Sequence, residues 1–128
     1  MSPAYYVKEE KSMEITRLHV GKRLSEVAIH NGTVYLAGQI AEETSLDVKG
    51  QTREVLGHID RLLAESGSDK TCILSCQIYI ADMADFDGMN EEYDAWVPGG
   101  HTPPRATVQA ALANKGYKIE VVVTAARR

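Results

Sequence analysis

Residues 117–125, "YKIEVVVTA", have the clearest strand pattern in this chain of 128 residues. Ile119, Val121 and Val123 fall on one side of an extended backbone, whereas Glu120 falls on the opposite side. A carboxylate is costly to bury without a partner, so the pattern indicates one core face and one accessible face. The stretch therefore predicts a half-buried strand that displays Glu120.

A second alternating run, residues 105–112, "RATVQAAL", follows a pair of prolines. Proline fixes φ and restricts the residue before it, so the backbone is stiff where Arg105 is presented. Arg105 and Thr107 share one face of this run. If it lies next to the strand at 117–126, Arg105 and Glu120 project into one place. A structural ion pair, or two separate exposed charges, is the alternative interpretation.

The rest of the chain extends these two strands into a βββαβαββ order. The predicted strands are 13–20, 23–31, 33–41, 71–81, 105–112 and 117–126, and the predicted helices are 47–67 and 82–97. Asn31-Gly32 is a strong hairpin signal between the second and third strands. Asp47 and Gly67 are suited to the ends of the first helix, and Asp82 is suited to capping the second. This order predicts an α+β domain, a mixed sheet with both helices on one face.

Composition is that of one globular domain, 1–128, with a polar and flexible leader at 1–11. The chain is 44% hydrophobic and 25% charged, and its net charge is −4. No Lys/Arg cluster is present, which disfavours nucleic-acid binding. No apolar run approaches the ~20 residues of a membrane span, and the leader lacks the apolar core of a secretory signal. We therefore expect a cytoplasmic protein with neither a membrane nor a nucleic-acid partner.

Cysteines and histidines give no metal or redox signature. Cys72 and Cys76 are predicted on one strand, ~13 Å apart, too far for a disulfide. We place both on its apolar side together with Leu74, as small buried hydrophobes. The four histidines lack metal-ligand spacing and are expected at surfaces or sheet edges: His19, His30, His58 and His101. His101 is the least settled, because its loop leads into Arg105.

Five segments occur in an order that resembles the Rid family, the YjgF-type reactive intermediate deaminases, also labelled L-PSP endoribonucleases. They are "TVYLAGQIA", "GQTREVLGHIDRLLAESGS", "CQIYIADMADFDGMNEEYDAW", "TPPRATV" and "YKIEVVVTAA". The likeness covers roughly residues 23–126. Its most specific parts are Gly38-Gln39-Ile40, Asn90 with Tyr93, the Pro-x-Arg turn at 103–105, and Glu120.

The resemblance implies a chorismate-mutase-like fold and a homotrimer with a cleft at each subunit interface. In such proteins the residue matching Arg105 clamps a substrate carboxylate, and the one matching Glu120 orients a water. The substrates are 2-imino and 2-enamino acids, the products are 2-keto acids and ammonia, and no cofactor or metal is needed. Backbone groups near Gly38 and Thr107 would complete the pocket, with Asn90 beside them, since glycine allows close approach of a ligand.

Three positions depart from the family pattern. Leu24 stands where many members have tyrosine, Ala37 where they have serine, and Thr107 where they have cysteine. The loss of two hydroxyl groups at Leu24 and Ala37 predicts a cleft that prefers more apolar substrates or turns over more slowly. The role of the cysteine is attributed largely to its backbone carbonyl, so threonine is expected to serve.

Three functions are consistent with these residues. Hydrolytic deamination of 2-imino and 2-enamino acids uses both Arg105 and Glu120, and is the leading hypothesis. A non-catalytic trimer that binds small carboxylates, as a sensor or metabolite buffer, needs Arg105 alone. An endoribonuclease is disfavoured by the acidic balance and the absent basic stripe.

Overall fold

The computed structural model describes residues 14–128, so the leader expected at 1–11 lies outside the described residues. The strands are β1 (Thr16–Val20), β2 (Ser25–His30), β3 (Thr33–Leu36), β4 (Gln39–Ile40), β5 (Ile73–Ile80), β6 (Arg105–Gln109) and β7 (Ile119–Ala126). The helices are α2 (Val48–Glu65) and α3 (Phe86–Trp96), with short 3-10 turns η2 (Lys70–Cys72) and η3 (Met83–Asp85).

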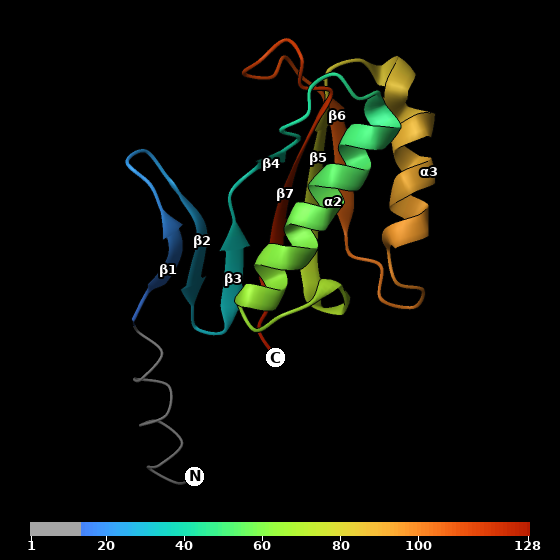
Figure 1. Ribbon diagram of the computed structural model, residues 1–128. Helices are drawn as coiled ribbons and strands as arrows, with labels where there is room; N and C mark the ends of the chain where they lie inside the picture. Colours follow the sequence, from blue (N-terminus) through green and yellow to red (C-terminus); the bar gives the residue numbers. More distant parts are fainter. Residues whose placement is uncertain (1–13) are drawn as a thin grey trace, which may run out of the picture.

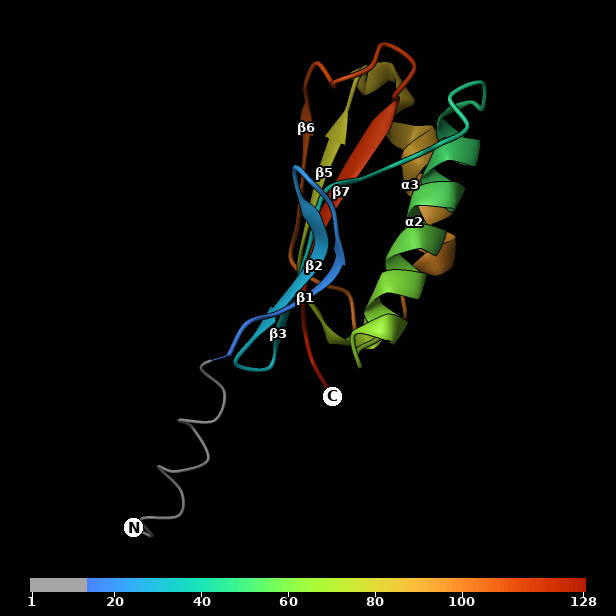
Figure 2. The same ribbon diagram turned by 60° about the vertical axis from the view of Figure 1, so that its left-hand side comes forward.

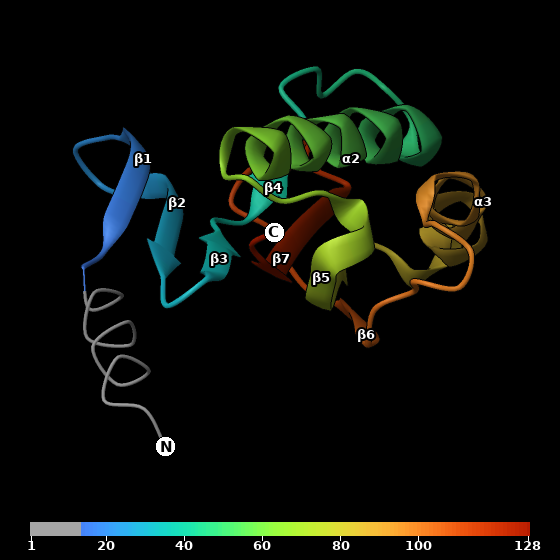
Figure 3. The ribbon, with the colours of Figure 1, turned by 90° about the horizontal axis from the view of Figure 1, so that it is seen from below.

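The strands form one mixed sheet in the order β1-β2-β3-β7-β5-β6, with β4 beside β7 (Figure 1). Strands β5 and β6 are parallel, and the other pairs are antiparallel. Both helices lie on the same side of the sheet (Figure 2). Seen from below, α2 runs over β4 and β7, and α3 lies beyond it on the side of β5 and β6 (Figure 3). The predicted α+β arrangement is confirmed.

The side chains of β7 alternate between the two faces of the sheet, one that is covered by the helices and one that is not. Ile119, Val121 and Val123 are at most 1% exposed and pack under the helices, on what we call the helix face. Glu120 and Val122 are partly exposed on the opposite side, which we call the open face. The half-buried strand predicted from "YKIEVVVTA" is confirmed, because the two-residue period sends alternate side chains to opposite faces.

The third predicted strand is interrupted, which gives the separate strands β3 and β4. Tyr35 pairs with Thr124, whereas Gln39 pairs with Val121, so four steps along one strand oppose three along the other. The extra residue lies next to Gly38 and is equivalent to a β-bulge. It moves Gln39, which is 4% exposed, onto the helix face. Simple alternation along 33–41 does not anticipate this.

The two helices begin differently. The Asp47 side chain accepts a hydrogen bond from the Gly50 amide at 2.9 Å, and α2 ends just before Gly67, whose φ is +77°. Both predicted ends of the first helix are confirmed. Asp82 instead caps the 3-10 turn η3 through the Ala84 amide, and α3 begins later, at Phe86.

No helix within residues 14–128 is long and apolar enough to cross a bilayer.

Strand β5 contains a second irregularity, and it corrects the expectation for the cysteines. Its register against β7 shifts between Ile73 and Ser75, so Leu74 is 50% exposed rather than buried. Cys72 lies before the strand, in η2, and Cys76 alone takes the expected place in the core. Both thiols are free. Burial raises the pKa of Cys76 to about 11, which keeps this thiol protonated near neutral pH.

The last two strands are shorter than predicted. Strand β6 stops at Gln109 rather than continuing to Leu112, and β7 starts at Ile119 rather than Tyr117. The partner strand β5 ends at Ile80, whose carbonyl still accepts from the Ala110 amide. Beyond that point the chain has no strand to pair with, so it leaves the sheet.

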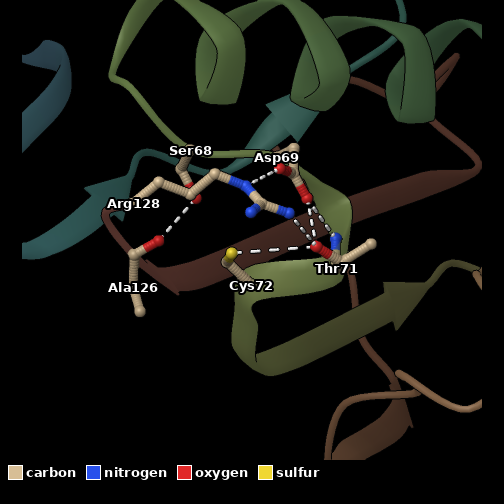
Figure 4. Close-up of polar contacts among 6 residues, drawn as sticks. All are labelled: Ser68, Asp69, Thr71, Cys72, Ala126 and Arg128. Carbon is tan, nitrogen blue, oxygen red and sulfur yellow. Dashed lines mark hydrogen bonds and ion pairs between the residues drawn. The ribbon is translucent and has the colours of Figure 1, made fainter.

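The end of β7 is tied to the segment between α2 and β5 (Figure 4). Arg128 donates through Nε to Asp69 and through Nη2 to the Thr71 hydroxyl, at 3.0 Å in the second case. Asp69 also accepts from the amide and hydroxyl of Thr71. The Ser68 hydroxyl donates to the Ala126 carbonyl at 2.6 Å. The hydrogen bond from Arg128, followed by those from Thr71, holds the pKa of Asp69 well below its usual range.

This cluster predicts a specific pH dependence of stability. Because its pKa is lowered on folding, Asp69 stabilises the fold above its unfolded pKa of ~3.9, and this contribution is lost as the pH falls below that value. In Asp69→Asn, the free energy of unfolding should fall less steeply between about pH 5 and pH 3 than in the native protein. Urea denaturation at a series of pH values measures this. Parallel slopes for the two proteins would contradict it.

Candidate functional site

Arg105, the first residue of β6, is held in place by helix α3. Its Nη1 donates to Asn90 Oδ1 at 2.7 Å, and its guanidinium carbon lies 4.6 Å from the centre of the Tyr93 ring. Asn90 and Tyr93 are one turn apart on α3 and therefore present one surface to Arg105. Burial raises the pKa of the Tyr93 hydroxyl. A half-buried arginine stacked on an aromatic ring has little freedom of orientation, which suits it to a planar partner.

The backbone in front of Arg105 is also restrained. The carbonyl of Pro104 accepts from the Cys76 amide at 3.0 Å, so the proline pair is bonded to β5 before β6 begins. Proline removes freedom of φ, and this bond fixes the position of the chain. His101 is exposed, and its Nδ1 lies 3.2 Å from the Gly99 carbonyl oxygen within its own loop.

Thr107 lies two residues further along β6, on the same face as Arg105. It pairs with Ile78 of β5, as Arg105 pairs with Cys76, and both partners are buried on the helix face. The Thr107 hydroxyl is buried and has no hydrogen-bond partner within residues 14–128. An unpaired buried hydroxyl is unfavourable for the fold, so its position is of interest for ligand binding.

Glu120 lies on the open face. It pairs with Tyr79 of β5 and with Ile40 of β4. A Cβ built on Gly38 would be 2.2 Å from Glu120 Oε2, so the carboxylate lies directly over this glycine. Beside it is a hollow of about 300 Å³. The hollow is lined by Tyr79, Ala110, Ala111, Leu112, Ala113, Glu120 and Val122.

Arg105 and Glu120 were expected to project into one place if their strands were neighbours, and within one chain this condition is not met. Strand β5 lies between β6 and β7, so the two strands are not neighbours. Arg105 is in register with Cys76 on the helix face, whereas Glu120 is in register with Tyr79 on the open face. Because side chains alternate along every strand, this register keeps the two side chains on opposite sides of the sheet.

Leu24 and Gly38 line a second hollow, of about 290 Å³. Its other lining residues are Glu26, Gln39, Ile40, Glu42, His58 and Arg61. Leu24 is 57% exposed. Ala37 donates its amide to the Glu26 carbonyl at 2.9 Å, and its own carbonyl accepts from Gln39 Nε2 at 2.9 Å, so its backbone is already bonded.

The predicted site residues therefore fall into two halves. One half is Arg105, Thr107 and Asn90 at β6 and α3; the other is Glu120, Gly38, Ala37 and Leu24 near β4 and the start of β2. Tyr93 and the 110–113 loop were not predicted as site residues. The three-residue spacing of Asn90 and Tyr93 could have indicated that Tyr93 lies beside Arg105. The sequence of the 110–113 loop contains no comparable signal. Within residues 14–128, no cluster of His, Cys, Asp or Glu side chains is placed to hold a metal ion.

Residues 14–127 match the family model described as endoribonuclease L-PSP. The chain belongs to this family. It is 49% identical over 112 residues to a RutC family protein of Haemophilus ducreyi, covering 88% of this chain and 96% of that protein. A YjgF family structure from Neisseria meningitidis superposes with a TM-score of 0.89 at 42% identity, covering 91% and 98% of the two chains. The predicted family and its chorismate-mutase-like fold are confirmed.

A further relative is named for an activity. It is the chloroplastic Reactive Intermediate Deaminase A of Arabidopsis thaliana, 33% identical over 97 residues. The match covers 71% of this chain and 51% of that protein. The family thus includes a protein named as a deaminase, whereas the more similar Haemophilus ducreyi relative is named by its family alone.

The unpaired hydroxyl of Thr107 predicts an unusual response to substitution. Thr107→Val keeps the shape and removes the buried polar group, so it should raise the free energy of unfolding by about 1 kcal/mol. Thr107→Ser keeps the hydroxyl, loses a methyl group and should be less stable than the native protein. Urea denaturation of the three proteins measures both effects. A destabilised Thr107→Val would mean that the hydroxyl has a partner in the folded protein.

Proposed function

We propose that this protein hydrolyses 2-imino and 2-enamino acids to 2-keto acids and ammonia, in a cleft to which two subunits contribute one half each. The observation that carries the proposal is the fixed position of Arg105. Its side chain is hydrogen-bonded to Asn90 and stacked on Tyr93, and the Pro104 carbonyl before it is hydrogen-bonded to β5. The name of the Arabidopsis thaliana relative supports the reaction class. The reaction is a hydrolysis, so it transfers no electrons and requires no co-reactant besides water.

Arg105 would bind the substrate carboxylate. Within residues 14–128 its guanidinium donates one hydrogen bond, to Asn90, which leaves further N–H groups for a ligand. A guanidinium matches a carboxylate with two parallel hydrogen bonds, so it sets the orientation of the neighbouring C2 atom as well as the affinity. Stacking on Tyr93 reduces the entropy lost when the substrate binds.

Glu120 would handle the water and the protons. As a general base it takes a proton from water while the oxygen adds to C2 and the C=N electrons move to nitrogen. Glu120 returns this proton to the nitrogen, which completes the neutral carbinolamine. It then takes the proton of the C2–OH and passes it to the nitrogen as the C–N bond breaks, so that ammonia leaves and the ketone forms. Each turnover therefore leaves Glu120 as it began. Glu120 is partly exposed on the open face, and its carboxylate lies over Gly38, where any side chain would collide with it.

A second copy of the chain is needed to bring the halves together. Arg105 and Glu120 lie on opposite faces of one sheet, so a substrate that touches both must lie between two subunits. The open face offers a contact surface: Tyr35 is 49% exposed and Val108 is 43% exposed. Both described helices lie on the other side of the sheet (Figure 2). A head-to-tail contact that closes into a ring uses one half from each neighbour, and a trimer closes with three identical clefts.

The lining of the proposed cleft favours apolar substrates. Leu24 and Ala37 carry no hydroxyl groups. The hollow beside Glu120 is lined mostly by apolar side chains, with Tyr79 and Glu120 as its polar members, and the apolar ones are Leu112, three alanines and Val122. An apolar pocket discriminates by about 1–3 kcal/mol for each well-filled group. We therefore propose imines derived from leucine or methionine as better substrates than the imine derived from serine.

Single substitutions test the two roles. Arg105→Ala should lower catalytic efficiency by about 100-fold or more, because it removes a bidentate charged contact worth about 3 kcal/mol. Arg105→Lys should restore little of the catalytic efficiency, since the ammonium group of lysine cannot form the two parallel hydrogen bonds of a guanidinium. Glu120→Gln should slow hydrolysis and leave binding of the 2-keto acid product largely intact. The assay generates imines from leucine and from serine with an amino-acid oxidase and follows their decay.

Thermal melts and sedimentation of every variant serve as the control for folding and assembly. Near-normal hydrolysis by a correctly folded Arg105→Ala would refute the mechanism. Product binding that needs Arg105, without any acceleration of imine decay by the native protein, would favour the carboxylate-binding alternative. Equal loss of product binding in both variants would favour a structural role for the two charges.

Mixing the two inactive variants tests the shared cleft. Arg105→Ala and Glu120→Gln are unfolded, mixed in equal amounts and refolded together. Random assembly into trimers, of about three times 14.1 kDa, places an intact Arg105 against an intact Glu120 in about one cleft in four. About a quarter of the native rate should therefore return, whereas either variant refolded alone stays inactive. A mixture as inactive as its components would overturn the assignment of the two residues to different subunits.

A further inference from the structure

Gln51 is a long polar side chain inside the hydrophobic core. It lies in the first turns of α2, is fully buried, and is among the largest completely buried side chains of residues 14–128. A buried amide is unfavourable unless both its oxygen and its nitrogen are hydrogen-bonded. Gln51 therefore has to find partners, and all of them lie outside its own helix.

The partners of Gln51 are backbone groups of two loops. Its Nε2 lies 2.9 Å from the Gly116 carbonyl, 3.1 Å from that of Leu46 and 3.3 Å from that of Thr44. Its Oε1 accepts from the Lys118 amide at 2.9 Å. One side chain thus bonds the segment after β4 to the segment before β7.

The two loops also contact each other directly. A Cβ added to Gly116 would lie 2.8 Å from the Thr44 Cβ, closer than such atoms approach without movement. Residues 44 and 116 therefore form a close junction, with Gln51 bonded to it from the core side. We call residues 44–46 with 116–118 the loop junction.

The loop junction is continuous with the surroundings of Glu120. Lys118 lies two residues before Glu120, and its carbonyl accepts from the Ala81 amide at 3.1 Å, beyond the end of the β5–β7 ladder. Strand β4, which leads into the other loop, supplies Ile40 as the pairing partner of Glu120. The hollow beside Glu120 is lined by residues 110–113, in the same connection as Gly116. Strand β7, which carries Glu120, and strand β4, which pairs with it, therefore both connect to loops that are hydrogen-bonded to Gln51.

We propose that Gln51 is a positioning residue for Glu120. It fixes the loop junction, and through it the place of the carboxylate over Gly38 and the shape of the hollow beside it. The inference rests on the catalytic role proposed for Glu120. Arg105 has no part in it, because its half of the cleft is built on β6 and α3.

Gln51→Met tests the proposal, because methionine is similar in size to glutamine but apolar, and so removes all four contacts. The kcat for imine hydrolysis should fall about tenfold, with KM and the affinity for the 2-keto acid of leucine within twofold of native values, because Arg105 is untouched. Thr52→Val is the matched control. Thr52 is the next residue of α2, is also fully buried, and makes one hydrogen bond, to the Val48 carbonyl at 2.6 Å within the helix. It should alter the thermal melt and leave kcat unchanged.

A second readout is independent of activity. In Gln51→Met, backbone amides at 113–118 should exchange with deuterium at least tenfold faster than in the native protein, with no change in β6, and Thr52→Val should show no such local change. If the native protein hydrolyses no imine, the proposed function falls, and exchange still decides whether Gln51 holds the loop junction.

Gly116→Ala disturbs the same junction from outside the core, and serves if Gln51→Met does not fold. Its matched control is Gly57→Ala on α2, where a Cβ meets no atom within 4 Å. Gly116→Ala should lower kcat with KM unchanged, and Gly57→Ala should not. A Gln51→Met or Gly116→Ala protein that keeps the kcat of its control, or unchanged exchange at 113–118, would overturn the proposal.

Discussion

The side-chain alternation of β7 is the constraint on which the rest of the structure depends. This strand pairs with β3, β4 and β5, so its register sets the faces of most of the sheet. Ile119, Val121 and Val123 are committed to the core under α2, and the two-residue period then commits Glu120 to the open face. A one-residue slip would bury the carboxylate and expose three large apolar side chains, which makes the register strongly determined.

Much of this fold follows from local rules, and the side chains that were assigned to the wrong face share one cause. The ends of α2 at Asp47 and Gly67, the turn at Asn31-Gly32, where both residues have positive φ, and the faces of β7 were all predictable from residue type and period. The rule that failed was the assignment of alternate side chains to opposite faces, and it failed next to an irregularity in a strand. The extra residue near Gly38 and the shift between Ile73 and Ser75 each move the following side chains to the other face. Bulges of this kind depend on partner strands, which the sequence of one strand does not contain.

The candidate site shows the same division between local and long-range information. The faces of Arg105 and Glu120 were correctly assigned within their own strands, and the family resemblance singled out both residues. Their mutual placement depended on whether β6 and β7 are neighbours, and the insertion of β5 between these strands is a property of the topology. The role of Gln51 could not be predicted from the sequence either. Its i, i+4 neighbours on α2 mark it as part of a buried stripe, yet its partners are up to 67 residues away.

The separation of the two charged groups has a physical advantage. In one chain, Arg105 is stabilised by Asn90 and Tyr93, and Glu120 is partly exposed on the open face, so neither charge is buried without a partner. In the cleft that we propose between two copies, water would be excluded only where substrate binds, and electrostatic interactions would be stronger there than in bulk solvent. Such a cleft requires each half to be rigid on its own, since no covalent connection aligns them. The bonded Pro104 supplies that rigidity at Arg105, and the loop junction held by Gln51 supplies it at Glu120.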